Sequence, residues 1–257
     1  MSARRSTSSL LTALALLLAG CASVPAPPSQ PLAPEVHRLL NALDRRWAEF
    51  EDLRTQVDIA LRRGDRAQRL SGVLLLKSPD SIRLEALSPW GQPLMILTTT
   101  ATSFTLYQVA ENRALVGPAS ARSTERWLGV PLEPVELVGI LSGRFLPMKE
   151  PQRGILRPPD GLGPSLELMG ADRVQRIWFD SETLIVRQVE WTGGGTRLRV
   201  IYTGDNSERP PTGLTLEALD RQLTLSVRYQ EPELGVGIPA ELFRLDLPES
   251  AKIRHLR

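Results

Sequence analysis

The stretch that decides the fold runs from residue 55 to residue 77 and reads TQVDIALRRGDRAQRLSGVLLLK. In its first half Val57, Ile59 and Leu61 alternate with polar residues, which is the period-two pattern of a strand with one buried face. The segment RRGD at 62–65 has turn composition, and a second apolar strand follows it from about Gln68. The stretch therefore predicts a β-hairpin.

Short strands of the same kind follow the hairpin, each close to a turn signal. We expect them at 82–86, 94–98, 104–106, 114–116, 165–169, 174–180, 183–192, 197–203, 213–220 and 222–229, with a proline-rich loop at 147–164. Strands that follow one another after tight turns form antiparallel sheets. About eleven strands are too many for a flat sheet, so the sheet must curl, split or close on itself.

Helical periodicity appears before the hairpin and again in the middle of the chain. The first helix is expected from Pro34 to about Arg54, with apolar residues at three- and four-residue spacing at Val36, Leu39, Leu40, Leu43, Trp47, Phe50 and Leu53. Shorter helices are expected from Ser123, at 134–142 and near 239–243. The predicted fold is mainly β with α: a curved antiparallel sheet of about eleven strands, a half-open β-barrel, with helices covering the concave face. A β-sandwich remains the alternative.

The N-terminus has the layout of a bacterial lipoprotein precursor. Residues 1–20 combine a basic start, an apolar stretch from Leu10 to Leu18 and a small-residue end, as a secretory signal does. The sequence LAGC at 18–21 resembles a lipobox, which predicts cleavage before Cys21 and acylation of this one cysteine of the chain. The acyl groups would anchor the protein to a membrane.

The remaining organisation follows from this start. Residues 21–34 carry the cysteine and five prolines after it, and they predict an extended tether. Residues 35–257 have the length of a single all-β domain. By resemblance to enterobacterial lipoproteins, Ala22 in place of aspartate predicts the periplasmic face of the outer membrane.

Composition and motifs argue against several function classes. The 31 basic and 29 acidic residues nearly cancel, so no nucleic-acid partner is expected. The two histidines, His37 and His255, are far apart in sequence and predict neither a metal pair nor a catalytic base. The glycines at 193–195 lie between two predicted strands and read as a hairpin turn. We therefore expect no enzyme activity, no cofactor, no metal and a monomer.

Three segments give the chain a resemblance to a known family. They are LEALSPWG at 84–91, WLGVPLEPVEL at 127–137 running into ILSG at 140–143, and the pair 174–179 and 198–202 with its ending Tyr202-Thr203-Gly204. In this order they resemble the LolB family, the outer-membrane lipoprotein receptors that accept lipoproteins from the periplasmic carrier LolA. The resemblance covers most of residues 35–230. After Tyr229 the chain is more similar to uncharacterised LolB-like lipoproteins.

The resemblance implies a function and a site. An acylated lipoprotein, delivered by a LolA-like carrier, would place its acyl chains in an apolar cavity and be inserted into the outer membrane. The family's exposed apolar loop residue falls on Trp90, between Pro89 and Gly91, where this sequence has tryptophan instead of leucine. Trp90 either stands out as an insertion residue or folds back to cap the sheet. The alternative function is a LolB-like lipid-binding or structural envelope lipoprotein without receptor activity.

The acyl-chain cavity would be lined by inward-facing apolar residues of the strands and of the middle helix. The candidates are Leu74, Leu76, Ile82, Leu84, Leu94, Ile96, Phe104, Leu106, Leu137, Ile140, Leu141, Ile177, Phe179, Val200 and Tyr202. For each of them a place in the ordinary hydrophobic core is the competing interpretation. A further hypothesis gives scattered arginines, at 122, 126, 144, 173, 176, 187, 197 and 199, a binding face for an acidic carrier or anionic head groups.

Overall fold

The structure is a computed structural model that describes residues 32–204 and 211–256. The predicted signal peptide, Cys21 and most of the tether lie outside the described residues. Among the described residues no helix has both the length and the apolar character needed to cross a membrane.

One sheet contains all fourteen described strands. In chain order they are β1 (Asp52–Arg63), β2 (Arg66–Lys77), β3 (Ser81–Leu87), β4 (Pro93–Thr99), β5 (Ser103–Gln108), β6 (Arg113–Pro118), β7 (Arg153–Asp160), β8 (Gly163–Met169), β9 (Arg173–Phe179), β10 (Val186–Gly193), β11 (Thr196–Thr203), β12 (Gly213–Ala218), β13 (Leu223–Leu234) and β14 (Lys252–His255). Their order across the sheet is β14-β6-β5-β4-β3-β2-β1-β13-β12-β11-β10-β9-β8-β7. Every pairing is antiparallel except that of β14 with β6.

The hairpin predicted at 55–77 is the centre of this sheet. It forms β1 and β2, and Ile59 pairs with Leu70 across it. The side chains of Val57, Leu74 and Leu84 are buried on the concave face, whereas their neighbours along each strand point outward. The alternation in the sequence therefore marks the face that the sheet turns toward the interior.

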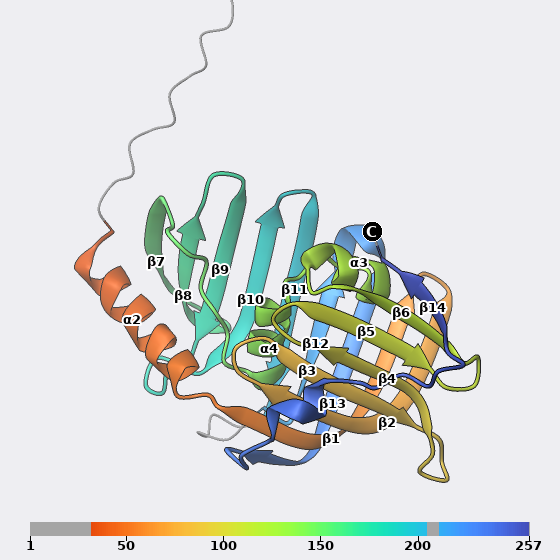
Figure 1. Cartoon of the computed structure of the whole chain (residues 1–257). Helices are drawn as coiled ribbons and strands as arrows, with labels where there is room; N and C mark the ends of the chain where they lie inside the picture. The colour runs from red at the N-terminus through yellow and green to blue at the C-terminus, as the bar shows by residue number, and fades with distance from the viewer. Residues whose placement is uncertain (1–31, 205–210, 257) are drawn as a thin grey trace, which may run out of the picture. The chain divides into compact units, whose positions relative to one another are not determined.

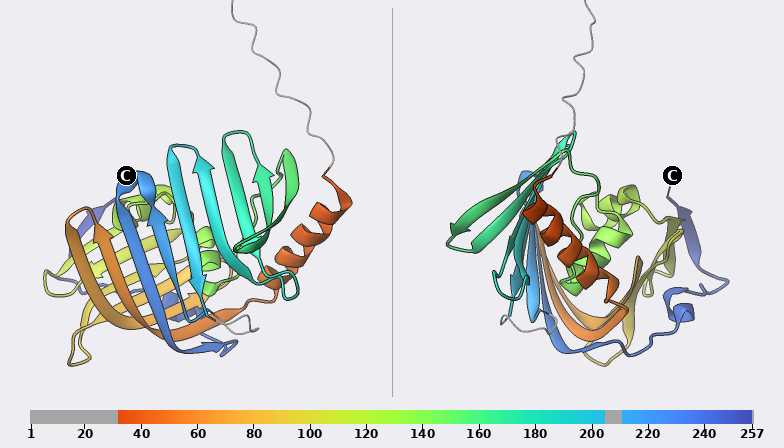
Figure 2. Two further views of the ribbon diagram at one scale, coloured as in Figure 1. Left: turned by 180° about the vertical axis from the view of Figure 1, so that it is seen from behind. Right: turned by 90° about the vertical axis from the view of Figure 1, so that its left-hand side faces the viewer.

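Three helices lie inside the curve of the sheet. They are α2 (Pro34–Ala48), α3 (Ala121–Leu128) and α4 (Pro134–Ser142), and short 3₁₀ turns occur at η1 (Leu219–Arg221) and η2 (Ala240–Phe243). Figure 1 shows α3 and α4 between the two limbs of the sheet, and the right panel of Figure 2 shows the sheet bending around the helices. The predicted fold class, an open curved sheet with helices on its concave face, is confirmed.

Several predicted boundaries were wrong. The first helix ends at Ala48 instead of near Arg54, because Asp52 already begins β1 and the fully buried Leu53 belongs to its alternating pattern. The region 147–164, expected to be a loop, contains β7. Its prolines are compatible with a strand because β7 is at the edge of the sheet, where a missing N–H breaks no ladder. The tail also forms a strand, β14, whose four residues are all exposed and carry no apolar pattern.

Candidate functional site

The concave interior, where the sequence places an acyl-chain cavity, is filled by side chains. Eleven of the fifteen candidates are buried in one continuous hydrophobic cluster, namely Leu74, Leu76, Ile82, Leu84, Phe104, Leu106, Leu137, Ile140, Ile177, Phe179 and Val200. The helix α4 contributes Leu137, Val138 and Ile140 to the cluster, and Phe145, just after the helix, packs edge-on against Trp191 with ring centroids 5.1 Å apart. These residues are core in this state of the protein.

Two of the candidates face the wrong way. Ile96 pairs with Glu85 and Tyr107 on the outer face, and Leu94 is 50% exposed. The inner face of β4 is instead occupied by Leu97, which pairs with the buried Leu84. The sequence LMIL at 94–97 is apolar at every position, so no alternation of apolar and polar residues indicates which of them face the interior. The last two candidates, Leu141 and Tyr202, are half-buried and pack against the cluster.

The β3–β4 turn projects Trp90 into solvent, with 82% of its surface exposed. Ser88 builds the turn: its carbonyl accepts from the Gly91 N–H at 2.9 Å and its hydroxyl from the Gln92 N–H at 3.1 Å. Gly91 has φ +78°, a conformation that side chains disfavour. Of the two alternatives for Trp90, the structure has the exposed one.

Several apolar side chains at the same end of the sheet as Trp90 are only half-buried. On the inner face Ile59, Leu61 and Met95 are half-buried, and so is Trp127 of α3. The helix is tied to this end, because Arg63 donates to the Leu128 carbonyl at 2.6 Å. Apolar side chains in partial contact with water therefore border the core at this end of the sheet, which we call the Trp90 end.

The opposite end of the interior is closed by polar groups. A cavity of about 60 Å³ lies there between α2, the C-terminus of α4 and the strands β10 and β11. Its volume is far below the roughly 300 Å³ at which ligand pockets usually begin. Tyr229, buried nearby, donates to the Leu141 carbonyl at 2.6 Å, and burial raises the pKa of both Tyr202 and Tyr229, so both are protonated phenols at neutral pH.

Larger hollows among the described residues are open depressions, on the outer face of the sheet and beside α2. Two of them, of about 730 and 740 Å³, share Asp58, Arg69 and Ser71 on β1 and β2. Hydrogen bonds from Ser71 and then from Gln230 lower the pKa of Asp58, so this carboxylate is ionised and already engaged. The depressions have mixed polar and apolar linings and are open to solvent, so they do not enclose a ligand.

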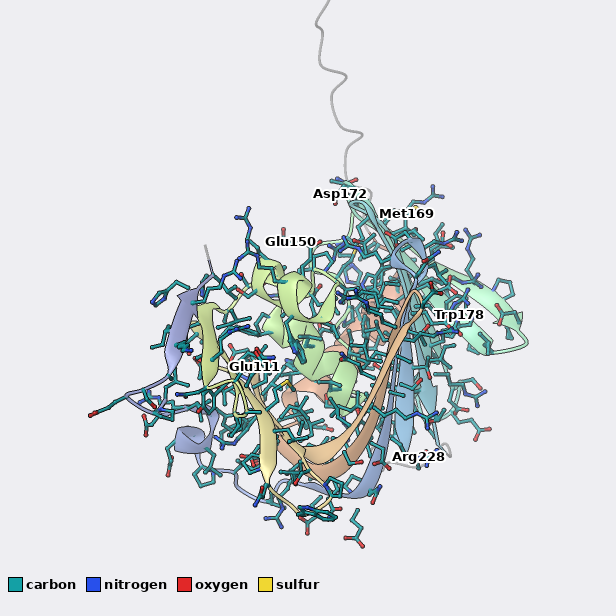
Figure 3. All side chains as sticks on the ribbon, turned by 90° about the vertical axis from the view of Figure 1, so that its right-hand side faces the viewer. Glu111, Glu150, Met169, Asp172, Trp178 and Arg228 are labelled. Carbon is teal, nitrogen blue, oxygen red and sulfur yellow. The ribbon has the colours of Figure 1, made fainter. Side chains whose placement is uncertain are left out.

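The arginines suggested as a binding face are largely paired within the chain. The carboxylate partners are Glu136 for Arg173, Asp160 for Arg176, Asp180 for Arg187, and both Glu190 and Glu217 for Arg199. On the outer face Arg176 also stacks 4.2 Å from the Trp178 ring. Figure 3 shows Trp178 and Arg228 on the side of the sheet away from the helices. Four of the eight arginines thus have carboxylate partners within the chain.

Residues for metal or acid–base chemistry do not gather in the described chain. His37 is exposed on α2 and His255 is exposed on β14, and no group of three metal-ligating side chains occurs among the described residues. The Gly193–Gly195 segment is the turn between β10 and β11, as predicted.

An open, strongly curved antiparallel sheet that holds helices and an apolar core in its concavity defines the class of this protein. No protein-family model and no curated protein matches the chain. Solved structures do. A DUF1329 family protein from Desulfovibrio piger aligns with a TM-score of 0.56 at 12% identity, over 82% of this chain and 96% of its own.

Two other solved structures share this fold. One is a proposed outer membrane lipoprotein-sorting protein domain from Vibrio parahaemolyticus, with a TM-score of 0.52 at 12% identity, over 81% of this chain and 94% of its own. The other is a LolA superfamily protein from Nitrosomonas europaea, with a TM-score of 0.50 at 14% identity, over 86% of this chain and 99% of its own. At these identities the likeness shows a common LolA-like fold.

Proposed function

We propose that this chain is a lipid-anchored envelope protein that takes up the acyl chains of lipoproteins in its concave interior and helps insert them into the outer membrane. The observation that carries the proposal is the exposed Trp90, presented on a hydrogen-bonded turn at an end of the sheet where half-buried apolar side chains border the core. The fold it shares with a LolA superfamily protein and a lipoprotein-sorting domain supports the same function.

Anchoring would come from Cys21, which lies outside the described residues. Two or three acyl chains on this cysteine hold a protein on a bilayer durably, because each buried methylene contributes about 0.8 kcal/mol. The tether at 22–34 would let the domain reach both the membrane and a LolA-like carrier. The protein would act as a monomer on the periplasmic face.

Uptake requires the interior to open, since its side chains now fill it. The Trp90 end is the natural entrance, because α3 is held there by few polar contacts. Arg63 donates to the Leu128 carbonyl, and Arg221 bridges Glu125 at 2.6 Å and the Gly129 carbonyl at 2.9 Å. Displacing α3 would expose Trp127 and the inner face of β1 and β4. Burial of hydrocarbon there would supply about 25 cal/mol per Å².

Release follows from the position of Trp90. An indole ring prefers the interface between lipid head groups and acyl chains. Insertion of Trp90 would bring the mouth of the interior against the bilayer, and the acyl chains would leave without crossing water. A cavity that binds acyl chains more weakly than a bilayer does, but more strongly than the carrier does, gives the transfer its direction.

The test is transfer of a radiolabelled acylated lipoprotein from a LolA-like carrier to liposomes that bear the mature, acylated protein. We expect Trp90→Glu to abolish delivery into the lipid while the handover from the carrier to the protein persists. The matched control is Leu242→Glu, which introduces the same charge at an apolar residue that is 43% exposed at the other end of the sheet. Equal delivery by Trp90→Glu and wild type would refute the insertion role.

The filled interior favours a second candidate, a LolB-like envelope lipoprotein that binds another lipid or serves a structural purpose. The two proposals differ at the first step of the same assay. A well-folded wild type that takes no lipoprotein from the carrier would leave only the second.

A further inference from the structure

The turn that carries Trp90 has a basic neighbour, the tip of the β1–β2 hairpin. This tip consists of residues 62–69, with the sequence RRGDRAQR. The strand β2 pairs with β1 along its whole length, but its pairing with β3 begins only at Ser71, opposite Leu87. Residues 66–70 therefore have no strand beside them on the β3 side among the described residues. Because β2 and β3 are antiparallel, the hairpin tip and the Trp90 turn lie at the same end of the sheet.

One open hollow on the outer face joins the hairpin tip to the Trp90 turn. Its volume is about 740 Å³. Both elements contribute to its lining, with Arg69, Leu70, Ser88, Pro89, Gly91 and Leu94. Leu94 is 50% exposed, and Trp90 stands on the same turn. Basic and exposed apolar side chains thus share one surface.

The arginines of the hairpin tip are not neutralised by the fold. The tip contains four arginines and one aspartate, Asp65. Arg62, Arg66 and Arg69 are exposed, and none of them has a carboxylate or hydrogen-bond partner among the described residues. The fourth, Arg63, donates to a backbone carbonyl, which leaves its charge in place. The tip therefore keeps an excess of positive charge after Asp65 is counted.

The charged residues around the tip and the turn do not reverse this excess. Asp58 of β1 lies opposite Arg228 of β13 in the ladder. Glu111, in the turn before β6, pairs with Arg113 at 3.2 Å. The helix α3 and the turn η1 together contribute Arg122, Arg126 and Arg221 against Glu125 and Asp220.

We propose that the hairpin tip and the Trp90 turn together form a docking surface for a bilayer that contains anionic phospholipids. Guanidinium groups match the phosphate oxygens of lipid head groups in geometry and charge. Trp90 and Leu94 would enter the boundary between head groups and acyl chains, where an indole is favoured. An acidic protein would satisfy the arginines but would leave the two exposed apolar side chains unexplained, whereas an anionic bilayer satisfies both.

This inference rests on the proposed function, in which Trp90 meets the bilayer, and it adds the class of lipid and a second set of contacts. Arg62, Arg66 and Arg69 are distinct from the arginines that the sequence suggested as a binding face. With two points of contact, the turn and the tip, the bilayer would also fix the orientation of the domain.

The experiment is cosedimentation of the mature chain with vesicles, using Cys21→Ser so that no acyl group holds the protein on the lipid. Vesicles of phosphatidylcholine alone are compared with vesicles that also contain phosphatidylglycerol. We expect stronger binding to the anionic vesicles and a loss of this preference as the salt concentration rises. The triple variant Arg62→Gln, Arg66→Gln, Arg69→Gln should lose roughly a hundredfold in partition onto the anionic vesicles, because each basic residue contributes about fivefold. Its weaker binding to phosphatidylcholine, which depends on Trp90, should persist.

Two further triple variants serve as controls. Arg38→Gln, Arg153→Gln and Arg244→Gln make the same change of net charge at exposed residues of α2, of β7 and of the segment after η2. This variant should bind the anionic vesicles nearly as well as the unchanged chain. Lysine in place of the three tip arginines keeps the charge and should retain most of the binding.

The outcomes separate this inference from the proposed function. Equal binding of the unchanged chain to both kinds of vesicle, or an equal loss in the Arg38, Arg153 and Arg244 variant, would overturn the inference. The proposed function would survive either result, because the transfer assay tests delivery and its loss in Trp90→Glu independently. A tip variant that binds anionic vesicles normally but no longer takes the lipoprotein from its carrier would assign the arginines to an acidic protein and overturn the bilayer assignment.

Discussion

The two ends of the curved sheet surround the same apolar core but present different chemistry. At the Trp90 end a turn carries an indole that is 82% exposed, and half-buried apolar side chains reach the mouth of the interior. At the other end, which we call the arginine end, three arginines and Tyr202 line a cavity of about 60 Å³ together with apolar side chains such as Leu43 and Phe145. The two ends therefore differ in what they present: one exposes a large apolar side chain to solvent, and the other packs arginines and a tyrosine around a small cavity.

The largest effect is expected from the core between the two ends. Ile140 of α4 is 1% exposed and belongs to the central cluster. Replacing it with alanine should lower the free energy of unfolding by about 2–5 kcal/mol, because a packed interior leaves a cavity when a large side chain is removed. Chemical denaturation measures this. A loss of unfolding free energy below about 1 kcal/mol would mean that the interior beside Ile140 is already hollow. The space inside the sheet would then be continuous from one end to the other.

A smaller effect is expected at the arginine end, where two buried tyrosines have different partners. Tyr229 donates to the Leu141 carbonyl at 2.6 Å, so Tyr229→Phe should destabilise the protein by about 1–2 kcal/mol. The Tyr202 hydroxyl has no described partner, so Tyr202→Phe should be close to neutral. Thermal unfolding of the two variants side by side tests the contrast. Equal losses would show that the Tyr202 hydroxyl is satisfied within the chain.

The pH dependence of stability provides a third test of the arginine end. Asp180 accepts from the backbone N–H and hydroxyl of Thr183, from the Glu182 N–H and from Arg187, and these hydrogen bonds lower its pKa from 3.8 to about 2. Because the folded-state pKa is the lower one, the stabilisation is complete above the unfolded-state value of 3.8. It is lost as the pH falls from about 4 toward 2.

Urea unfolding of wild type and Asp180→Asn between pH 2 and pH 7 measures this contribution. The variant should be less stable than wild type at pH 7, and the difference should shrink as the pH falls toward 2. A difference that stays constant over this range would mean that the carboxylate charge of Asp180 does not stabilise the fold.

Much of the fold follows from local patterns in the sequence. The hairpin of β1 and β2, the helices α3 and α4 and the turn at Gly193–Gly195 coincide with predicted elements because each has a clear period or turn signal. The strand β14 was missed because its pairing with β6 depends on a contact between segments about 140 residues apart. The sequence did not predict which residues of β4 face the interior, because both faces of this strand are apolar.

The two candidate sites likewise differ in whether a local sequence pattern predicts them. Trp90 was found from a local segment, and the structure needed only to decide between its exposed and folded-back positions. The small cavity at the arginine end was not predicted, because Arg46 is a surface-type residue of a helix, and only the folding of the chain brings it to Arg187 and Tyr202. Arg144 and Arg187 were among the arginines considered for a binding face, but nothing in the sequence indicated that these two side chains lie close together.

The smallest effect on stability is expected at Trp90, although its effect on function should be large. Trp90 is exposed and contributes little to the core, so Trp90→Ala should change the free energy of unfolding by no more than about 0.5 kcal/mol. The same change removes the large apolar side chain of the turn, so binding of the unacylated domain to anionic liposomes should weaken severalfold, as measured by cosedimentation. Trp90→Phe retains an aromatic ring and should keep most of the binding. If Trp90→Ala instead costs 2 kcal/mol or more, the indole packs against the protein in solution, and the two ends of the sheet are less different than the structure shows.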